Sequence, residues 1–550
     1  MVECLKEEGV RYVFGIPGGQ TLSLTEAIRT APGMEFVATR HEGGAAHAAD
    51  GWGRVTGTPG VCLATTGPGA TNLLTGIGGA FRDSSPVIVL TCNNNRKDIG
   101  RGDAQDADHV ALFHSLTKWS TFVADVRQVP EVMREAFRVA LGGRPGPVHI
   151  DFARDVLEQE AVDFEPLPPE RYRVEDRRPG DARLVAQATE LLAGSRRPAL
   201  WVGNGAKLAG ASREVLQLAD LLQSPVITTF NGIGAVPSTH PLVFGPRSRS
   251  GTRLTNEILT EADTVLVVGS SLSGPATSRW RLKLTSNLVQ VDIDYLALGR
   301  HYPVKVGIVG DARLVLAQLV HGLSAGSGAA AAARQAREGR QAWLSEMKQR
   351  ETAWEEQVYR PEFETAVPIK PQTLIRRLGK WLAQDAIVCV DAGNPGIWSH
   401  LLPMYEGTTY MKPVNFGNMG FALPAGIAAK LARPGREVVI LIGDGSLGMV
   451  LGEIETAVRS KTPVIIVVMN DLAYGNIKQE QWHYYGPENI GVDFTDVNYA
   501  DVARALGAAG ERITRPETLV DALDRARRAQ RPYLIDVLTD PRENVWESPF

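Results

Sequence analysis

Cysteine is scarce in this chain, whose 550 residues include only Cys4, Cys62, Cys92 and Cys389. No two of them have the Cys-x-x-Cys spacing of zinc ligands or redox dithiols, so the sequence predicts neither kind of site from cysteine. Three of the four lie in short apolar runs that are typical of strands. We therefore expect buried, reduced thiols and no disulfide framework.

Long apolar runs and an excess of positive charge are also missing. No apolar run is long enough to span a bilayer, and the first residues lack the basic-then-apolar pattern of a signal peptide. The 58 Lys and Arg against 62 Asp and Glu give a net charge of −4, without a basic stripe. We expect a cytoplasmic protein with no membrane partner and no nucleic-acid partner.

The composition that is present fits a globular enzyme of several domains, with 44% apolar and 22% charged residues. Strand-like runs alternate with helical stretches, the pattern of parallel α/β sheets. We predict α/β domains at residues 1–160, 182–322 and 371–550, with a linker and surface helix at 323–370. The predicted strands include Tyr12–Gly15, Gly60–Thr65, Pro86–Leu90, Pro147–Asp151, Ala199–Val202, Pro225–Thr228, Thr264–Val268, Leu288–Asp292, Glu437–Ile442 and Val464–Met469.

Two acidic residues follow the last two of these strands. Asp444 stands in Gly443-Asp444-Gly445-Ser446, and Asp471 comes 27 positions later. Helical periodicity over Met449–Arg459 makes the whole a strand-helix-strand unit, so both carboxylates emerge at the carboxyl edge of the sheet.

Carboxylates at such an edge suit a hard cation that bridges to phosphates, and N–H groups at a helix start suit an anion. A Gly-Asp-Gly alone is usually a turn. The second half at this spacing, closed by Tyr474-Gly475, favours a site for magnesium and a diphosphate.

This pair of segments resembles the thiamin-diphosphate motif of the pyruvate decarboxylase and acetolactate synthase superfamily. The resemblance covers essentially the whole chain and implies three doubly wound parallel-sheet domains, which bind the pyrimidine, form the centre and bind the diphosphate. It implies magnesium ligands at Asp444, Asp471 and Ala473. It also implies cofactor contacts at Gly443, Asp444, Gly445, Ser446, Asp471, Ala473, Tyr474, Gly475, Asn476 and Ile477.

One position of this motif departs from the family, which normally has Asn where this chain has Asp471. Two carboxylates and a diphosphate around one ion leave more negative charge than the Asn version. We expect binding to survive with a stronger requirement for the metal.

Glu42, in Arg40-His41-Glu42-Gly43-Gly44, matches the family's catalytic glutamate. The resemblance implies that it hydrogen-bonds the pyrimidine ring and favours the imino tautomer, which removes the thiazolium C2 proton. In the family this acid and the metal motif meet across a subunit interface, so a homodimer or homotetramer is expected. The small residues after Glu42 suit a contact between subunits. Taken alone, Glu42 could equally be an acid at a helix start.

Three further segments resemble family elements around the cofactor. The segment Thr66–Asn72 is expected near the aminopyrimidine, Asn415–Pro424 beneath the bend of the cofactor, and Asp391–Gly396 at the diphosphate. Alone, the first could be a plain turn and Met419 a core residue. The implied contacts are Gly67, Asn72, Gly393, Asn394, Pro395, Gly417, Asn418 and Met419.

The substrate pocket is expected to include Gly19, Gln20, Gln105, Asn476 and Glu480. Gln105 could also be a solvated loop residue. The family's Phe before that glutamine is Ala104, and Glu480 stands where acetolactate synthases have a Trp. Glu480 lies four residues after Asn476, so both can face one pocket, or Glu480 can face solvent. If it faces the pocket, it favours a polar or cationic acceptor.

The first hypothesis is a carboligase of the acetolactate-synthase type that decarboxylates a small 2-oxo acid such as pyruvate and adds the acyl carbanion to a carbonyl. The alternatives are a non-oxidative decarboxylase or C–C lyase, including an acyl-CoA lyase, and an FAD-dependent pyruvate oxidase. The synthases have Gly-Ala-Arg-Phe-Asp-Asp-Arg where this chain has Gly269–Gly274. No FAD is therefore expected. Gly203-Asn204-Gly205 is read as a turn, and the middle stretch shows no basic cluster for the ADP of coenzyme A.

Overall fold

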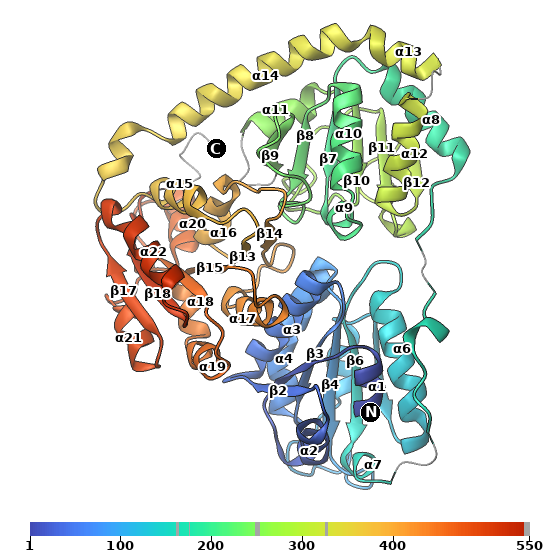
Figure 1. Ribbon diagram of the computed structural model, residues 1–550, viewed down its shortest axis with the longest axis vertical. Helices are drawn as coiled ribbons and strands as arrows, with labels where there is room; N and C mark the ends of the chain where they lie inside the picture. Colours follow the sequence, from blue (N-terminus) through green and yellow to red (C-terminus); the bar gives the residue numbers. More distant parts are fainter. Residues whose placement is uncertain (161–163, 175–176, 248–252, 325–327, 544–550) are drawn as a thin grey trace.

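The computed structural model describes residues 1–160, 164–174, 177–247, 253–324 and 328–543. They form three α/β units, each built on a six-stranded parallel sheet (Figure 1). This is the fold class that the sequence predicts. The three sheets fall within the predicted ranges 1–160, 182–322 and 371–550, whose bounds remain a prediction.

The first sheet has the strand order β2-β1-β3-β4-β6-β5. Its strands are β1 (Tyr12–Gly15), β2 (Glu35–Ala38), β3 (Gly60–Ala64), β4 (Val87–Asn93), β5 (Trp119–Val123) and β6 (Val148–Ala153). Its helices are α1 (Val2–Glu7), α2 (Leu22–Thr30), α3 (Glu42–Thr56), α4 (Pro68–Asp83), α5 (His109–His114), α6 (Val129–Leu141) and α7 (Arg154–Leu157).

The third sheet repeats this topology, with the order β14-β13-β15-β16-β18-β17. Its strands are β13 (Ile387–Val390), β14 (Thr409–Met411), β15 (Val438–Gly443), β16 (Ile465–Asn470), β17 (Ala509–Ile513) and β18 (Tyr533–Leu538). Its helices are α15 (Pro371–Trp381), α16 (Asn394–Trp398), α17 (Ala422–Ala432), α18 (Asp444–Met449), α19 (Glu453–Arg459), α20 (Gly475–Tyr485), α21 (Tyr499–Ala505) and α22 (Leu519–Arg528). In both sheets the connections change direction between the first and third strands, where open α/β sheets bind ligands.

The middle sheet has a different order, β12-β11-β10-β7-β8-β9, which is the order of dinucleotide-binding folds. Its strands are β7 (Pro198–Val202), β8 (Val226–Thr229), β9 (Val243–Arg247), β10 (Thr264–Val268), β11 (Leu288–Asp292) and β12 (Val306–Val309). Its helices are α8 (Ala182–Gly194), α9 (Asn204–Leu208), α10 (Ser212–Leu222), α11 (Arg253–Glu261) and α12 (Ala312–Ser324).

The central strands are buried on both faces, which explains their continuous apolar sequences. The edge strands β2, β5 and β17 are partly exposed and carry polar residues, so their sequences give a weaker strand signal. These edge strands are absent from the sequence prediction for this reason.

The segment predicted as a linker and surface helix differs from the prediction in how it packs. Helices α13 (Gly328–Gln335) and α14 (Arg337–Val358) fall in the predicted linker, and Figure 1 shows α14 running along the outside of the middle unit. Trp343, Leu344 and Met347 of α14 are buried in the middle unit's core, and the fully buried Arg340 donates hydrogen bonds to carbonyls around α8 and α10. The helix is therefore part of that core and not only a surface helix.

The helix expected over Met449–Arg459 is broken. It is replaced by the end of α18 and by α19, with turn residues between them. The four cysteines are buried and free, as expected. Among the described residues no single helix could cross a membrane, while the bent pair α12 and α13 passes that test by length and composition only.

The three units meet at the buried side chain of Asp83, which ends α4. Its carboxylate accepts hydrogen bonds from Arg54 of the first unit, Asn231 of the middle unit, and the backbone of Val414 and Asn415 of the third. The junction fixes how the first and third units lie against each other.

Candidate functional site

The carboxyl edge of the third sheet brings three predicted residues together. Asp444 begins α18 after β15, Asp471 follows β16, and Asn394 begins α16 after β13. The two oxygens of Asp444 accept hydrogen bonds from the backbone N–H groups of Gly445 at 3.0 Å and Ala473 at 3.1 Å. Asp471 accepts from the Asn394 Nδ2 at 3.0 Å.

These two carboxylates share one environment. Burial raises the pKa of Asp444, and the negative charge of Asp471 raises it further. Burial also raises the pKa of Asp471. The Oδ1 atom of Asn394 is buried and has no hydrogen-bond partner in the part of the chain that the structure describes. A cation beside them would therefore offset the repulsion between the two carboxylates, and the Asn394 Oδ1 could coordinate it.

The donor set suits magnesium with phosphate better than a metal held by protein alone. Among the described residues no three His, Cys, Asp or Glu side chains gather into a metal site. Magnesium is usually held by one or two carboxylates together with phosphate oxygens and water. The residues present therefore fit a magnesium ion that a diphosphate helps to hold.

Two glycines keep space beside this pair. A Cβ atom at Gly475 would lie 1.9 Å from the Asp471 Oδ2 and 2.5 Å from the Asn394 Nδ2. A Cβ atom at Gly445 would lie 2.7 Å from the ring of Tyr474. Both glycines are thus required by close packing around the acidic pair.

Asp391, which directly follows β13 and begins the predicted segment Asp391–Gly396, organises the same edge. Its carboxylate accepts hydrogen bonds from the backbone N–H groups of Ala392 at 2.9 Å, Gly420 at 3.0 Å and Ala422 at 2.8 Å. The Ser446 side chain bonds to the same carboxylate, whose pKa is raised by burial. Asp391 thereby joins the predicted Asn415–Pro424 loop to the start of α18. Only its position after a strand signalled this role.

The predicted loop residues around Met419 lie in different environments. Gly417 is exposed with φ +72°, Met419 is half-buried, and Pro395 packs near Gly443. Asn418 is buried, with its Nδ2 3.4 Å from the His47 Nδ1 of the first unit. Its side chain therefore faces the junction between units, away from the acidic pair. Gly393 caps α16 with φ +78°.

The carboxyl edge of the first sheet holds Glu42. This residue begins α3, is 8% exposed, and accepts a hydrogen bond from the Asn72 Nδ2 at 2.9 Å. A carboxylate of the third unit, Glu453 at the start of α19, accepts from the backbone N–H groups of Arg40 and His41. The start of α3 is thus held from both units.

The predicted pocket residues Gln20 and Gln105 lie at this same edge. Gln20 bonds to Thr65 after β3 at 2.9 Å and to Asn94 after β4 at 3.1 Å, and Gly19 is exposed beside it. Asn94 in turn donates to the carbonyl of Ala104. Gln105 is exposed, with φ +62°, and its carbonyl accepts from the Thr66 hydroxyl at 3.1 Å.

Helix α20 carries the remaining predicted residues. Asn476 and Glu480 are half-buried and Ile477 is 48% exposed. Gln479, between them, is buried and donates to the carbonyl of Glu543 at 2.8 Å. Trp482 turns back to the following loop, with its Nε1 2.9 Å from the Asn489 Oδ1. This tryptophan therefore packs on the helix's own loop.

The small residues of α3 pack within the chain. A Cβ atom at Gly51 would lie 2.6 Å from the backbone of Ala425 on α17, and one at Gly76 of α4 would lie 2.5 Å from the Ala46 Cβ. The expectation that this helix face contacts another subunit is wrong for these positions, because α4 and α17 already cover them.

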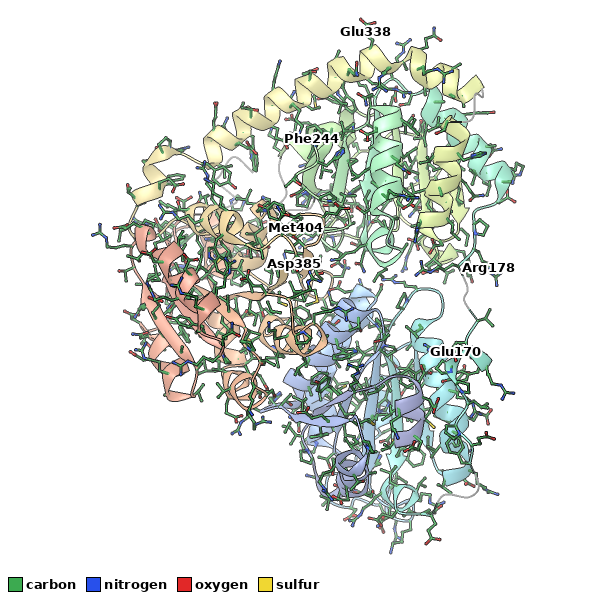
Figure 2. The ribbon with its side chains drawn as sticks, in the orientation of Figure 1. Glu170, Arg178, Phe244, Glu338, Asp385 and Met404 are labelled. Carbon is green, nitrogen blue, oxygen red and sulfur yellow. The ribbon has the colours of Figure 1, made fainter. Side chains whose placement is uncertain are left out.

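A separate cavity of about 1250 Å³ lies where the middle unit meets the first unit and the connecting segment. Among the described residues that line the cavity, the middle unit contributes Asn204, Gly205, Gly269 and Asp292 and no basic side chain. Basic side chains from the neighbouring segments line it instead: Arg82, Arg138, Arg144, Arg173, Arg177, Arg178 and Lys412. Figure 2 shows Glu170 and Arg178 on the segment that links the two units.

The turn at Gly203–Gly205 is explained by packing. A Cβ atom at Gly203 would lie 2.3 Å from the Gly269 carbonyl oxygen, and one at Gly205 would lie 2.7 Å from the Gly269 Cα. The glycines allow two turns of the middle sheet to touch.

Three family models match successive parts of the chain. They describe the thiamine pyrophosphate enzyme N-terminal TPP binding domain at residues 1–112, the central domain at residues 185–319, and the C-terminal TPP binding domain at residues 391–537. The acidic pair of the third unit lies within the last match, and Glu42 lies within the first.

Curated relatives match almost the full length. A probable acetolactate synthase large subunit from Methanocaldococcus jannaschii is 34% identical, with 99% of this chain and 92% of the relative covered. The large subunits of acetolactate synthase isozymes 3 and 2 from Escherichia coli are each 32% identical, with 99% of this chain covered and 95% and 96% of the relatives. The chain therefore belongs to the family of thiamin-diphosphate-dependent enzymes that contains these acetolactate synthase large subunits.

Proposed function

We propose that this chain is a carboligase of the acetolactate-synthase type that uses thiamin diphosphate and magnesium, with a small 2-oxo acid such as pyruvate as donor. When bound, thiamin diphosphate would supply the nucleophilic carbon and the electron sink that decarboxylation of a 2-oxo acid requires. The observation that carries the proposal is the nearly full-length similarity to acetolactate synthase large subunits, and the arrangement of Asp444, Asp471 and the Asn394 amide supports the cofactor site.

The residues of the third unit hold the cofactor in this proposal. Asp444, Asp471 and the backbone of Ala473 bind the magnesium ion. The remaining backbone N–H groups at the starts of α16 and α18 would hold the diphosphate, because helix starts attract anions. Asp391 keeps the loop through Gly417 and Met419 close to the same edge.

The residues of the first unit act on protons and substrate. Glu42 hydrogen-bonds the pyrimidine ring and moves a proton to and from it, while Asn72 holds its carboxylate. Gln20 and Gln105 offer amide groups to the donor's carboxylate or to the acceptor. Asn476, Ile477 and Glu480 on α20 line the other side of the pocket, where Glu480 selects a polar or cationic acceptor.

The proposal includes a homodimer or homotetramer. The support is the family resemblance, which implies that the glutamate of the first unit and the metal motif of the third unit meet across a subunit interface. We infer that each active site combines the first unit of one subunit with the third unit of another. A cytoplasmic location and domain boundaries at 160, 182, 322 and 371 stay part of the proposal.

The test is mass spectrometry and absorbance of the cofactors bound to the purified protein, followed by incubation with pyruvate and product analysis. Thiamin diphosphate with acetolactate or acetoin as product is the expected result. Acetaldehyde alone would replace the carboligase by a decarboxylase. A flavin spectrum with acetyl phosphate or acetate as product would replace it by an oxidase and would assign the cavity of the middle unit to FAD.

A further inference from the structure

A buried network behind the Thr66-Gly67 turn connects to the active-site edge of the first sheet. His109 begins α5 and is 1% exposed. Its Nδ1 lies 2.9 Å from the Asp151 Oδ1 on β6, and its Nε2 accepts a hydrogen bond from the Gly67 N–H at 3.0 Å. The ring therefore bridges the core of the sheet and the turn.

The two contacts determine which ring nitrogen carries the hydrogen. The Gly67 N–H can only donate, so the His109 Nε2 must accept and the ring hydrogen is on Nδ1, where it is donated to Asp151. The Thr66 hydroxyl lies 3.4 Å from the same Nε2 but donates to the Gln105 carbonyl at 3.1 Å. The neutral imidazole is thus held in one orientation.

Asp151 anchors this arrangement from the core. It is 1% exposed and also accepts hydrogen bonds from the Thr91 hydroxyl at 2.7 Å and the Asn93 Nδ2 at 2.9 Å. Asn93 donates as well to the carbonyl of Ala107, in the segment between Gln105 and His109. One carboxylate therefore fixes both the imidazole and the loop that carries Gln105.

The turn that His109 holds requires glycine and lies close to the proposed catalytic groups. Gly67 has φ +59° and ψ −108°, and a Cβ atom there would lie 2.6 Å from the Gln105 carbonyl oxygen. Gly67 caps α4, and Asn72 in the second turn of that helix donates to Glu42. A shift of the turn therefore moves Glu42's partner and Gln105 together.

We propose that His109, held by Asp151, is a positioning residue for this enzyme's reaction. It fixes the Thr66-Gly67 turn and thereby aligns Asn72, and through it Glu42, with Gln105. The proposal rests on the proposed function for the meaning of Glu42, but it concerns a residue outside the predicted site.

The chain offers a matched control in His149, a second buried histidine of the same network. Its Nε2 lies 2.8 Å from the Thr91 hydroxyl, its Nδ1 lies 2.8 Å from the Ser120 hydroxyl, and its ring stacks on Phe113. Among the described residues it reaches Asp151 through Thr91 and makes no hydrogen bond to the turn. Its removal perturbs the core without releasing Gly67.

The test compares His109→Leu, His109→Gln, Asp151→Asn and His149→Leu with the wild type. For each protein, the melting temperature, the affinity for thiamin diphosphate, the exchange of the bound cofactor's C2 proton with deuterated solvent, and kcat and KM for pyruvate are measured. Proton exchange needs no substrate, so it reports on Glu42 even if pyruvate is not the donor.

We expect His109→Leu to slow proton exchange and lower kcat by about 10- to 100-fold, the cost of a misplaced catalytic group. Cofactor affinity should be kept. His109→Gln should recover most of the rate, because its Oε1 can accept from the Gly67 N–H. Asp151→Asn preserves side-chain volume, but its side chain accepts hydrogen bonds at only one atom, so it should also slow exchange. This variant keeps the proposal testable if His109→Leu does not fold. His149→Leu should lower the melting temperature and keep the exchange rate.

Wild-type exchange in His109→Leu or in Asp151→Asn would overturn the proposal, and so would an equal loss in His149→Leu. A His109→Gln enzyme as slow as His109→Leu would also contradict it. Wild-type enzyme that exchanges the proton but gives no product from any 2-oxo acid would refute the proposed function and leave the assignment of His109 standing.

Discussion

The first and third sheets have the same strand order, yet the polar groups at their carboxyl edges differ. In the first sheet the residues after β3 and β4 are paired with neighbouring polar groups: Thr65 and Asn94 with the Gln20 side chain, and Thr66 with the Gln105 carbonyl. In the third sheet the residues at the same two places are Asp444 and Asp471, whose charges repel, beside an acceptor of Asn394 without a partner among the described residues. The first edge is organised by the protein alone, whereas the third is completed by a cation.

This difference indicates that the first and third sheets, which share one strand order, have different functions. An edge whose groups are already paired can hold Glu42 in one orientation before any ligand binds, which suits proton transfer. At the third edge, burial and the neighbouring Asp471 raise the pKa of Asp444, so two bare carboxylates are disfavoured and a divalent cation stabilises them, which suits holding a metal and a diphosphate. The four predictions that follow test this division, from the largest effect to the smallest.

Glu42→Gln is expected to lower kcat by about 10²- to 10⁴-fold, the usual contribution of general acid–base catalysis. Glutamine can still accept from Asn72, so the fold and the cofactor affinity should persist. Steady-state kinetics and calorimetric titration with thiamin diphosphate measure the two quantities. Full turnover in this variant would show that Glu42 does not take part in proton transfer.

Asp444→Asn is expected to weaken magnesium-dependent cofactor binding by more than roughly 100-fold. Loss of a residue that only hydrogen-bonds to a metal ligand typically costs about 10- to 100-fold, and Asp444 is proposed as a ligand itself. Both oxygens of Asp444 accept backbone N–H groups, of Gly445 and Ala473, and an amide can accept at only one of the two places. Thiamin diphosphate retained after gel filtration in magnesium reports the loss. Unchanged retention would contradict the metal site.

Asp471→Asn tests whether the third edge carries one negative charge too many. Asparagine can still accept from the Asn394 Nδ2, while one of the two repelling charges disappears. We expect cofactor affinity measured in a chelator to rise about tenfold, equivalent to roughly 1.4 kcal/mol of relieved repulsion. With saturating magnesium the variant and the wild type should differ less. If the variant and the wild type require the same magnesium concentration, the idea that Asp471 increases the requirement for the metal is refuted.

Glu480→Trp should change acceptor preference by about tenfold in favour of 2-oxobutyrate over polar carbonyl acceptors, the scale of discrimination by an apolar pocket. Glu480→Gln is the control, because it removes the charge without adding an apolar wall. Competition between two acceptors with product analysis gives the ratio. If neither substitution alters the ratio of the two products, Glu480 does not contact the acceptor.

The sequence predicts the parts of the fold and site that local patterns encode. The β15-α18 turn and the position of Asp471 follow from apolar runs and spacing, and Glu42 follows from a short motif. His109 and Asp151 were not predicted as site residues, because their partners are distant in the chain and become neighbours only when the sheet forms. Asp391 begins the predicted segment Asp391–Gly396, but its bonds to Gly420 and Ala422 could not be predicted from that segment. The basic side chains of the 1250 Å³ cavity were missed for the same reason.

The same limit explains the wrong expectation for α3. Its run of small residues indicates a close helix contact, but a sequence pattern does not say whether the partner is α17 of the same chain or another subunit. Gly51 against Ala425 shows that the contact is internal. The interface proposed for the active site must therefore use other surfaces than this helix face.

Mixing two inactive variants tests the central claim, that the first edge of one subunit and the third edge of another make one active site. Glu42→Gln and Asp444→Asn proteins are combined under conditions that allow subunit exchange, and acetolactate formation is followed, with each variant alone as control. A hybrid dimer has one site with both defects and one intact site, so random exchange should restore roughly a quarter of wild-type activity. No recovery despite demonstrated hybrid formation would contradict the account.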